Sequence, residues 1–325
     1  MNKSQNIVIT NFGENEMKVV QKLEEFRDLI LPSQNSNTRR AYLRDFQLFR
    51  DFCNASDLPS LSANLDTAKT VITRYVEFLL SKQLTKGTIK RKLSAISFFY
   101  AIADLSSANP VSNSKLFKEY LRGRLNKLDE EQKQANAFKI NNLDEFNKSV
   151  IGREMGLTLS EIRDAAIVNL AFDTMLRASN ITQLRVSDLK FGNNLVFVRR
   201  SKTDQDGKGS YRFMSDQTEL FCKKWIEKSK ITEGFLFRKI SKSERVGECL
   251  TYDGLLYIIK RIGKKIGLKI TCHSTRVGAA VSLYESGEKE IEIMRHGGWK
   301  SIAMVARYTE TAKLKIGGMA KLRSS

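Results

Sequence analysis

The chain has 325 residues, with 55 lysines and arginines against 36 aspartates and glutamates, so its formal net charge is +19. Hydrophobic residues make up 41% and charged residues 28%, a composition typical of globular proteins. No stretch approaches the about 18 consecutive apolar residues of a membrane-spanning helix. The positive excess predicts a polyanionic partner, with nucleic acid as the first candidate and an anionic membrane surface as the second.

Cysteine and histidine content argues against disulfide-based and metal-based classes of protein. The four cysteines are scattered and form no CxxC pair: Cys53, Cys222, Cys249 and Cys272. A zinc ribbon or a disulfide framework is therefore not expected, and a reducing compartment is favoured. The two histidines, His273 and His296, are too few for a multi-histidine metal site.

The polar character of the first residues predicts a flexible N-terminal extension over 1–35. A helical domain is predicted to follow over 36–127. From Thr38 onward, apolar residues recur at helical spacing and form one stripe: Tyr42, Phe46, Phe49 and Cys53. Similar stripes predict three more helices, over about 67–82, 85–103 and 113–126. Four or five helices within this length make a small all-α domain.

A polar segment without periodicity predicts an interdomain linker over 128–138. A second domain follows over 139–310 and starts helical. Thr158 and Glu161 have capping-box spacing before an apolar run that ends near 175.

The pattern then changes to that of a β-hairpin. Residues 194–200 and 211–214 are rich in β-formers, and Lys202 lies where the first strand meets the turn. More helices are expected near 216–229, 251–266, 274–286, 289–295 and 301–310. A short basic tail over 311–325 ends the chain.

A histidine and an arginine stand three apart at a predicted helix start. His273 and Arg276 therefore share one face, at the positive end of the helix dipole. Such a place suits a phosphate oxygen. In a basic protein the same pattern is more often an ordinary solvated helix start, so the pair alone does not establish a site.

Four further residues have an ordinary structural explanation when each is taken alone. Arg177 ends an apolar helix, and Lys202 lies at a hairpin turn, where surface cations are common. Trp299 follows two glycines and Tyr308 lies near the end of a predicted helix, so packing would explain both aromatic side chains. A functional role requires several of these groups to face one phosphate.

In chain order, the set resembles the signature of the tyrosine recombinase (phage integrase) family: Arg177, Lys202, His273, Arg276, Trp299 and Tyr308. The interval from His273 to Tyr308 is similar to the usual spacing in that family. The Cre-type branch is the most similar, through segments 172–189, 273–280 and 292–299, and a looser resemblance extends over 36–323.

The resemblance implies a two-domain, mainly α fold. Residues 36–127 would be a SAM-like core-binding domain whose four or five helices clamp DNA. Residues 139–310 would be an α+β catalytic domain with a small antiparallel sheet or hairpin. The tail over 311–325 would serve oligomerisation by docking into a neighbouring subunit.

The resemblance also implies an activity, site-specific breakage and rejoining of duplex DNA without ATP, cofactor or metal. Tyr308 would attack a backbone phosphate and form a 3′-phosphotyrosyl enzyme. His273 would act as the base that activates the phenol, and Lys202 as the acid that protonates the leaving 5′-oxygen.

Charge stabilisation would fall to three donors and one supporting residue. Arg177 and Arg276 would clamp the phosphate oxygens, and the Trp299 indole would add a neutral donor. The family commonly has Asp or Glu three residues after the first arginine, where this chain has Asn180. Asparagine keeps hydrogen-bonding capacity and loses the charge, which affects the expected rate and the protonation of His273.

The partner implied is double-stranded DNA with inverted-repeat recombination sites, bound by a homotetramer that is a monomer when free. No membrane partner is implied, and the expected location is the cytoplasm at the nucleoid. Six basic residues of the first domain are candidates for phosphate or groove contacts: Arg39, Arg40, Lys86, Lys90, Arg91 and Lys92. For each one alone, a solvated surface is an equally good explanation.

Two other functions remain open. One is a DNA-binding protein that keeps this fold and has lost catalysis, which Asn180 favours. The other is a type IB topoisomerase-like enzyme, which would relax supercoils without paired sites.

Overall fold

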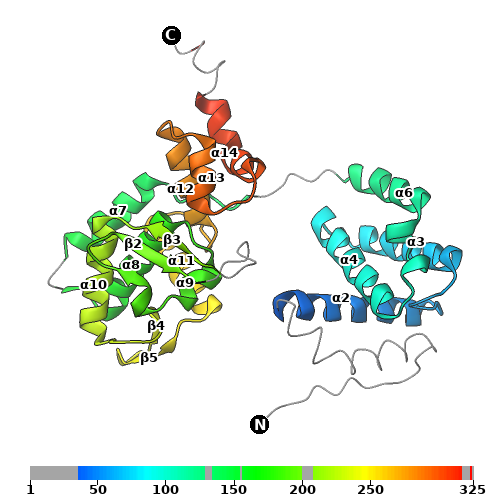
Figure 1. Ribbon diagram of the computed structural model, residues 1–325, viewed down its shortest axis with the longest axis horizontal. Helices are drawn as coiled ribbons and strands as arrows, with labels where there is room; N and C mark the ends of the chain where they lie inside the picture. The colour runs from blue at the N-terminus through cyan, green and yellow to red at the C-terminus, as the bar shows by residue number, and fades with distance from the viewer. Residues whose placement is uncertain (1–35, 129–133, 154–155, 200–207, 317–322, 324–325) are drawn as a thin grey trace. The chain divides into compact units, whose positions relative to one another are not determined.

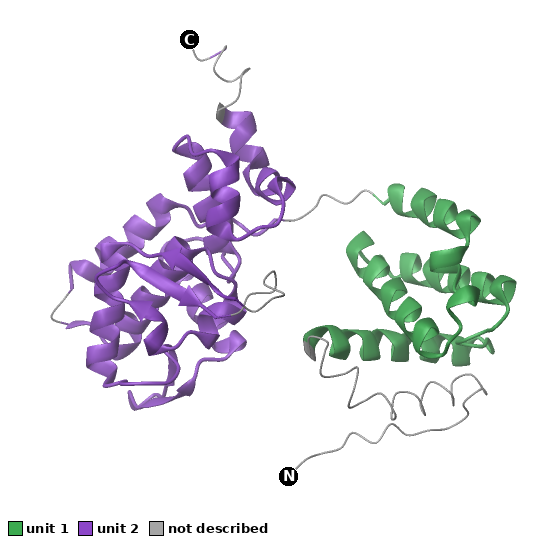
Figure 2. Cartoon of the chain, in the orientation of Figure 1, with its two compact units in different colours: residues 1–132 green, residues 133–325 purple. Residues whose placement is uncertain are grey.

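We describe a computed structural model of the chain, which covers residues 36–128, 134–153, 156–199, 208–316 and 323 (Figure 1). The chain divides into two compact units, Met1–Gln132 and Lys133–Ser325 (Figure 2). Each unit has its own hydrophobic core. Within the described ranges, no helix has the length and apolar character needed to cross a membrane.

The first unit is helical throughout its described part. Its elements are α2 (Ser36–Ala55), α3 (Leu65–Ser81), α4 (Lys86–Ile102), the 3-10 turn η1 (Ser106–Ala108), α5 (Pro110–Asn113) and α6 (Lys115–Asn126). Side chains that accept from backbone N–H groups cap four of the starts, Asn64 for α3, Thr85 for α4, Asn109 for α5 and Ser114 for α6. The predicted helical domain is confirmed, with η1 and α5 as short additions between the last two long helices.

Aromatic side chains join α2 to the other helices. Phe46 stacks on Phe99 of α4 with ring centroids 3.8 Å apart, and Phe49 packs on Tyr75 of α3 at 4.9 Å. Both phenylalanines belong to the predicted apolar stripe, which is therefore the buried face of α2.

A buried ion pair also ties α2 to α4. Asp45 exposes 1% of its side chain and accepts from the Lys92 ammonium at 3.1 Å, while Arg91 reaches the other carboxylate oxygen. Lys92 itself exposes 8% of its side chain. Because both charges are shielded from water, each is stabilised by the other rather than by hydration.

The second unit mixes helices with two small antiparallel sheets. Its elements are α7 (Ile140–Ile151), α8 (Leu159–Thr174), α9 (Ala178–Gln183), η3 (Val186–Asp188), β1 (Leu189–Lys190), β2 (Leu195–Val198), β3 (Ser210–Phe213), α10 (Asp216–Ser229), β4 (Arg238–Ile240), β5 (Val246–Cys249), α11 (Tyr252–Lys265), α12 (Ser274–Glu285), α13 (Glu290–Gly297) and α14 (Ile302–Ile316). The sheets have the orders β1-β2-β3 and β4-β5. The predicted hairpin is β2 paired with β3, and its tip at 200–207, which includes Lys202, lies outside the described residues.

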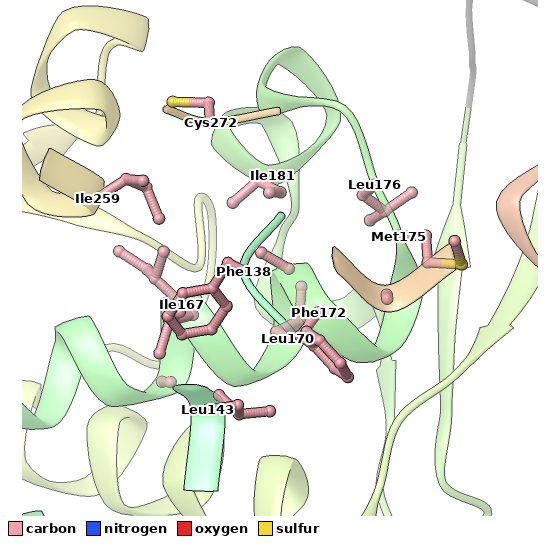
Figure 3. Close-up of a cluster of buried hydrophobic side chains, with 14 of the residues drawn as sticks. Phe138, Leu143, Ile167, Leu170, Phe172, Met175, Leu176, Ile181, Ile259 and Cys272 are labelled. Atoms are coloured by element: carbon pink, nitrogen blue, oxygen red, sulfur yellow. The ribbon is translucent and has the colours of Figure 1, made fainter. Parts of the chain in front are cut away.

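Helix α8 is the centre of this unit. The predicted capping box of Thr158 and Glu161 is present, and every residue from Ile162 to Phe172 is buried. Figure 3 shows α8 side chains such as Leu170 packed among residues from other elements, including Ile259 of α11. A helix that is buried on all sides forms the core of its domain.

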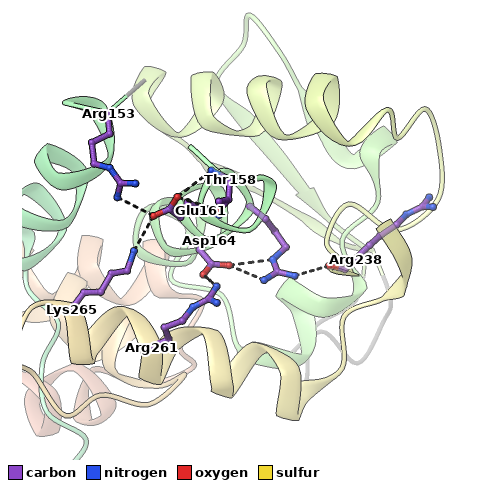
Figure 4. A network of polar contacts seen from close by, with 8 residues as sticks. Arg153, Thr158, Glu161, Asp164, Arg238, Arg261 and Lys265 are labelled. Atoms are coloured by element: carbon purple, nitrogen blue, oxygen red, sulfur yellow. Dashed lines mark hydrogen bonds and ion pairs between the residues drawn. The ribbon is translucent and has the colours of Figure 1, made fainter. Parts of the chain in front are cut away.

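Charged side chains at the start of α8 fasten it to α11 (Figure 4). Asp164 accepts from Arg261 of α11, and Glu161 accepts from Lys265 of α11 at 3.4 Å and from Arg153, which follows α7, at 3.1 Å. These pairs fix the N-terminal end of α8. The residues that follow its C-terminal end are described below.

Residues at the end of the predicted linker and at the start of the predicted tail belong to the second unit. Phe138 is fully buried, and its N–H donates to the Ser274 carbonyl at 3.0 Å. A Cβ on Gly278 would lie 1.7 Å from the Phe138 carbonyl oxygen, so only glycine allows the backbone at Phe138 to pack this closely on α12. The end of the 128–138 segment therefore packs with the second unit. At the other end, α14 continues the helix through 311–316 of the predicted tail.

Replacing Asp45 with asparagine should loosen the first unit. Asp45→Asn keeps the shape and leaves the buried Lys92 ammonium without a counter-charge, at a cost of about 3–5 kcal/mol. We expect amide hydrogen exchange in α2 and α4 to accelerate at least about 10²-fold, measured by mass spectrometry on the intact chain. The matched control is Asp51→Asn on the exposed side of α2, with an expected cost below about 0.5 kcal/mol. Equal exchange rates in the two variants would contradict a stabilising role for the buried ion pair of Asp45 and Lys92.

Candidate active site

A histidine and a tyrosine from distant parts of the second unit meet at hydrogen-bond distance. His273 immediately precedes α12, and its Nε2 lies 3.1 Å from the hydroxyl of Tyr308 on α14. Their rings meet edge to face with centroids 5.4 Å apart. Tyr308 exposes 8% of its surface, so its hydroxyl is held beside the imidazole.

Desolvation and surrounding positive charges both favour the neutral form of this imidazole. His273 is open to solvent on one side, yet partial desolvation of the ring lowers its pKa, and the charges of Arg276, Arg177 and Arg307 lower it further. A neutral imidazole accepts a proton, so His273 is able to take one from the phenol.

Arg276 is the most constrained group of the site. It is 3% exposed and donates to the carbonyls of Met175 and Gly297, the latter at 2.7 Å. Burial is the main cause that lowers its pKa, to about 10, so the guanidinium stays charged at neutral pH. A guanidinium has five N–H donors, so donors remain for an anion beyond these two carbonyls.

The turn after α13 places an indole over this guanidinium. The Trp299 ring centroid lies 4.4 Å from Arg276 Cζ and 5.3 Å from the Tyr308 ring. A Cβ on Gly297 would lie 2.2 Å from the indole, and Gly298 has φ +61°, so both glycines are required by this turn. Trp299 thus packs between the arginine and the tyrosine.

Arg177 reaches the site through a strained turn at the end of α8. Met175 has φ +49°, rare for a side chain of its size, and its carbonyl is the one that Arg276 binds. Arg177 follows as the first residue before α9, and its charge acts on both His273 and Arg276. Asn180 lies in the first turn of α9, and its N–H donates to the Arg177 carbonyl at 2.8 Å.

The structure therefore brings five of the six predicted catalytic residues together: Arg177, His273, Arg276, Trp299 and Tyr308. The sixth, Lys202, lies outside the described residues. Arg199, which follows β2 and is the last described residue before Lys202, pairs with the buried Asp188 at 2.7 Å.

Two arginines near the site had not been singled out from the sequence. Arg212 on β3 lowers the pKa of Arg276, and Arg307 on α14 lowers the pKa of His273. Arg307 directly precedes Tyr308, a sequence signal that could have been noticed. In the described parts of the chain, no cluster of three or more His, Cys, Asp or Glu side chains is arranged to hold a metal ion.

The basic residues predicted for DNA contact differ in availability. Arg40 and Lys90 are exposed, while Arg39 and Lys86 are partly exposed. Arg91 is partly exposed and bonds to Asp45.

Lys92 departs from the expectation of a surface contact, because its ammonium is buried against the same Asp45 carboxylate. Its charge belongs to the core of the first unit rather than to its surface.

Comparison with known proteins gives matches over both units. A model of the phage integrase family matches residues 141–315, and a model of the phage integrase N-terminal SAM-like domain matches residues 23–104. Recombinase Cre of Escherichia phage P1 is 25% identical over 268 residues, which cover 76% of this chain and 77% of Cre. An integrase/recombinase XerD homologue of Selenomonas ruminantium is 26% identical over 298 residues, 87% of this chain and 84% of the homologue.

A solved structure has the same fold. It is the Tn1549 transposon integrase in complex with transposon right end DNA, with a TM-score of 0.62 and 16% identity, covering 92% of this chain and 98% of that one. The family model for the catalytic domain spans more than half of the chain and includes the five grouped residues. The chain therefore belongs to the phage integrase, or tyrosine recombinase, family of site-specific DNA recombinases.

Proposed function

We propose that this chain cleaves a strand of duplex DNA with Tyr308, holds the broken end as a 3′-phosphotyrosyl ester, and rejoins it to a different strand. The observation that carries the proposal is the 3.1 Å contact between the Tyr308 hydroxyl and His273, within reach of the charges of Arg177 and Arg276. A nucleophile, a base and anion-binding groups in one place are the requirements for phosphoryl transfer to a side chain.

Activation of the nucleophile is the first step. A free phenol has a pKa of about 10, so Tyr308 is protonated at neutral pH unless a neighbour takes the proton. The neutral imidazole of His273 accepts that proton as the phenolic oxygen bonds to phosphorus. Nearby guanidinium charge lowers the cost of negative charge on the oxygen.

Cleavage is complete when the bond from phosphorus to the 5′-oxygen breaks. The leaving oxygen needs a proton, and Lys202 is the proposed donor. Arg177 and Arg276 bind the phosphate oxygens, whose negative charge increases in the transition state, and Trp299 offers a neutral N–H. A 5′-hydroxyl then attacks the phosphotyrosine and regenerates Tyr308, so the phosphoester is conserved and ATP is not required.

The proposed substrate is double-stranded DNA, supported by the net charge of +19 and by the transposon end DNA to which the Tn1549 integrase is bound in its structure. In the first unit, the exposed and partly exposed cations would contact phosphates: Arg39, Arg40, Lys86, Lys90 and Arg91.

We further propose that the DNA sites are inverted repeats and that four protomers assemble on each pair of sites. The tail around 311–325 would be exchanged between protomers, and the protein would act in the cytoplasm at the nucleoid. A Cre-type cycle stays a prediction, because the XerD homologue is as similar as Cre.

Removing the Tyr308 hydroxyl should abolish covalent capture of DNA. The wild-type chain, mixed with a library of nicked duplexes and denatured in SDS, is expected to give a protein–DNA adduct that Tyr308→Phe does not form. The ring packing against His273 and Trp299 is retained, so the variant should bind duplex as the wild type does. The matched control is Tyr257→Phe on α11, 67% exposed, which should form the adduct normally.

An adduct in Tyr308→Phe would exclude Tyr308 as the nucleophile. Salt-sensitive duplex binding by the wild type with no adduct, on a library that includes the natural site, would instead favour the DNA-binding function that Asn180 suggested.

The rate of adduct formation should depend on pH through His273. An ordinary histidine has a pKa of about 6.5, and the pKa of His273 is lower, so the neutral base persists below that pH. We therefore expect the single-turnover rate to be nearly constant from pH 8 to about 6.5 and to fall only in more acidic solution. His273→Ala should be slower and lose this acid limb. A midpoint above pH 6.5 in the wild type would contradict a neutral, pre-formed base.

A further inference from the structure

Arg212 occupies an inward-facing position on β3. It lies opposite Val196 of β2, and directly opposed residues of an antiparallel pair share one face of the sheet. Val196 is fully buried, while Tyr211 and Phe213 on either side of Arg212 are 54% and 50% exposed. The Arg212 side chain therefore points toward the interior of the unit, and it is half-buried.

The guanidinium of Arg212 lies against the turn that also holds Arg276. A Cβ on Gly298 would be 2.4 Å from Arg212 Nη2, so this nitrogen occupies space that the side chain of any other residue would need. Gly298 stands between Gly297, whose carbonyl accepts from Arg276, and Trp299, whose ring covers Arg276. Two guanidinium groups thus share the Gly297–Trp299 turn, and glycine is needed at 298 to admit the second.

Charge at this place is unbalanced. Arg177 and Arg212 both lower the pKa of Arg276, and burial lowers the pKa of Arg212 itself. In the described part of the chain no carboxylate pairs with Arg212, whose Nη1 donates to the neighbouring Tyr211 carbonyl at 2.8 Å. Asp173, at the end of α8, accepts from Ser215 and Thr218 instead.

Within the described residues, Arg177, Arg212 and Arg276 form no ion pair with a carboxylate, so their like charges repel, and Arg212 and Arg276 also lose hydration on burial. An anion that binds between them relieves both costs. A phosphodiester suits the place, because guanidinium groups match phosphate oxygens in pairs of parallel hydrogen bonds.

We propose that Arg212 is a third phosphate-binding guanidinium of the active site, in contact with the scissile phosphate or with the phosphate next to it on the same strand. This inference rests on the proposed function and adds a residue to it. In this proposal Arg212 contributes to the binding and cleavage of DNA and does not contribute to the stability of the DNA-free protein.

The first test separates these two roles without DNA. Removing Arg212 removes repulsion at Arg276, so the melting temperature of Arg212→Ala should equal or exceed that of the wild type. The matched control is Arg153→Ala, at the other end of α8, where the arginine is paired with Glu161 (Figure 4). A lower melting temperature for Arg212→Ala would indicate a structural role and overturn the proposal.

The second test uses the duplex recovered by covalent capture, made with one neutral methylphosphonate either at the scissile phosphate or at an adjacent one. On ordinary DNA, Arg212→Ala should form the adduct about 10²-fold more slowly than the wild type. Arg212→Lys keeps the charge without the fork and should lose about 10-fold. Arg153→Ala should match the wild type on every duplex.

The methylphosphonate substrates identify the phosphate that Arg212 contacts. With that phosphate neutral, Arg212→Ala and the wild type should differ by less than about 3-fold, while the full difference remains on the other substrates. A difference that is the same on every substrate, or no difference on ordinary DNA, would overturn the proposal.

Failure of the proposed function would be recognised separately, as a wild-type chain that forms no adduct. Arg212 would then be tested by binding to a random duplex at several salt concentrations. Loss of one phosphate contact should reduce the slope of log K against log[salt] by about 0.9 in Arg212→Ala. An unchanged slope would overturn the phosphate contact.

Discussion

The site depends on the buried guanidinium of Arg276. Its two carbonyl partners come from Met175, at the left-handed end of α8, and from Gly297, at the end of α13, while the arginine itself belongs to α12. One side chain therefore joins three helix ends, and Trp299 covers it on one face. Both carbonyl oxygens stand at helix ends, where backbone acceptors lack an intrahelical partner, and the guanidinium binds them. In the proposed function, the guanidinium held in this way would also define where the phosphate binds.

Around this guanidinium the fold gathers positive charge that the described residues do not neutralise. Arg177 directly precedes α9, Arg212 lies on β3 and Arg276 lies on α12, and the charges of the first two lower the pKa of the third. Partial desolvation lowers the pKa of His273, and the charges of Arg276, Arg177 and Arg307 lower it further, so the neutral imidazole is favoured. In the proposed reaction, substrate binding and activation of Tyr308 would therefore depend on the same group of charges.

Much of this fold could be predicted from the sequence, because apolar periodicity and capping residues act locally. Helix α10 spans the predicted 216–229, and the capping box of α8 is at the predicted place. Lys92 was predicted to contact DNA because a lysine in a helix is usually exposed to solvent. Its partner Asp45 lies 47 residues earlier in the chain, on α2, so the sequence does not show the pairing. Arg212 was missed for a related reason: its guanidinium lies against the turn at Gly298, and the sequence does not reveal that β3 meets this turn. The order of Arg177, His273, Arg276, Trp299 and Tyr308 was informative only as a set.

The most direct test of the account is to identify the residue that becomes linked to DNA. Trypsin cleaves after Arg307 and Lys313, so the adduct, digested with trypsin and nuclease, yields a short peptide that begins at Tyr308. The account predicts that mass spectrometry finds the nucleotide on this peptide, joined through a 3′-phosphate to the tyrosine. A nucleotide on a peptide that contains another tyrosine, or a linkage through a 5′-phosphate, would contradict it.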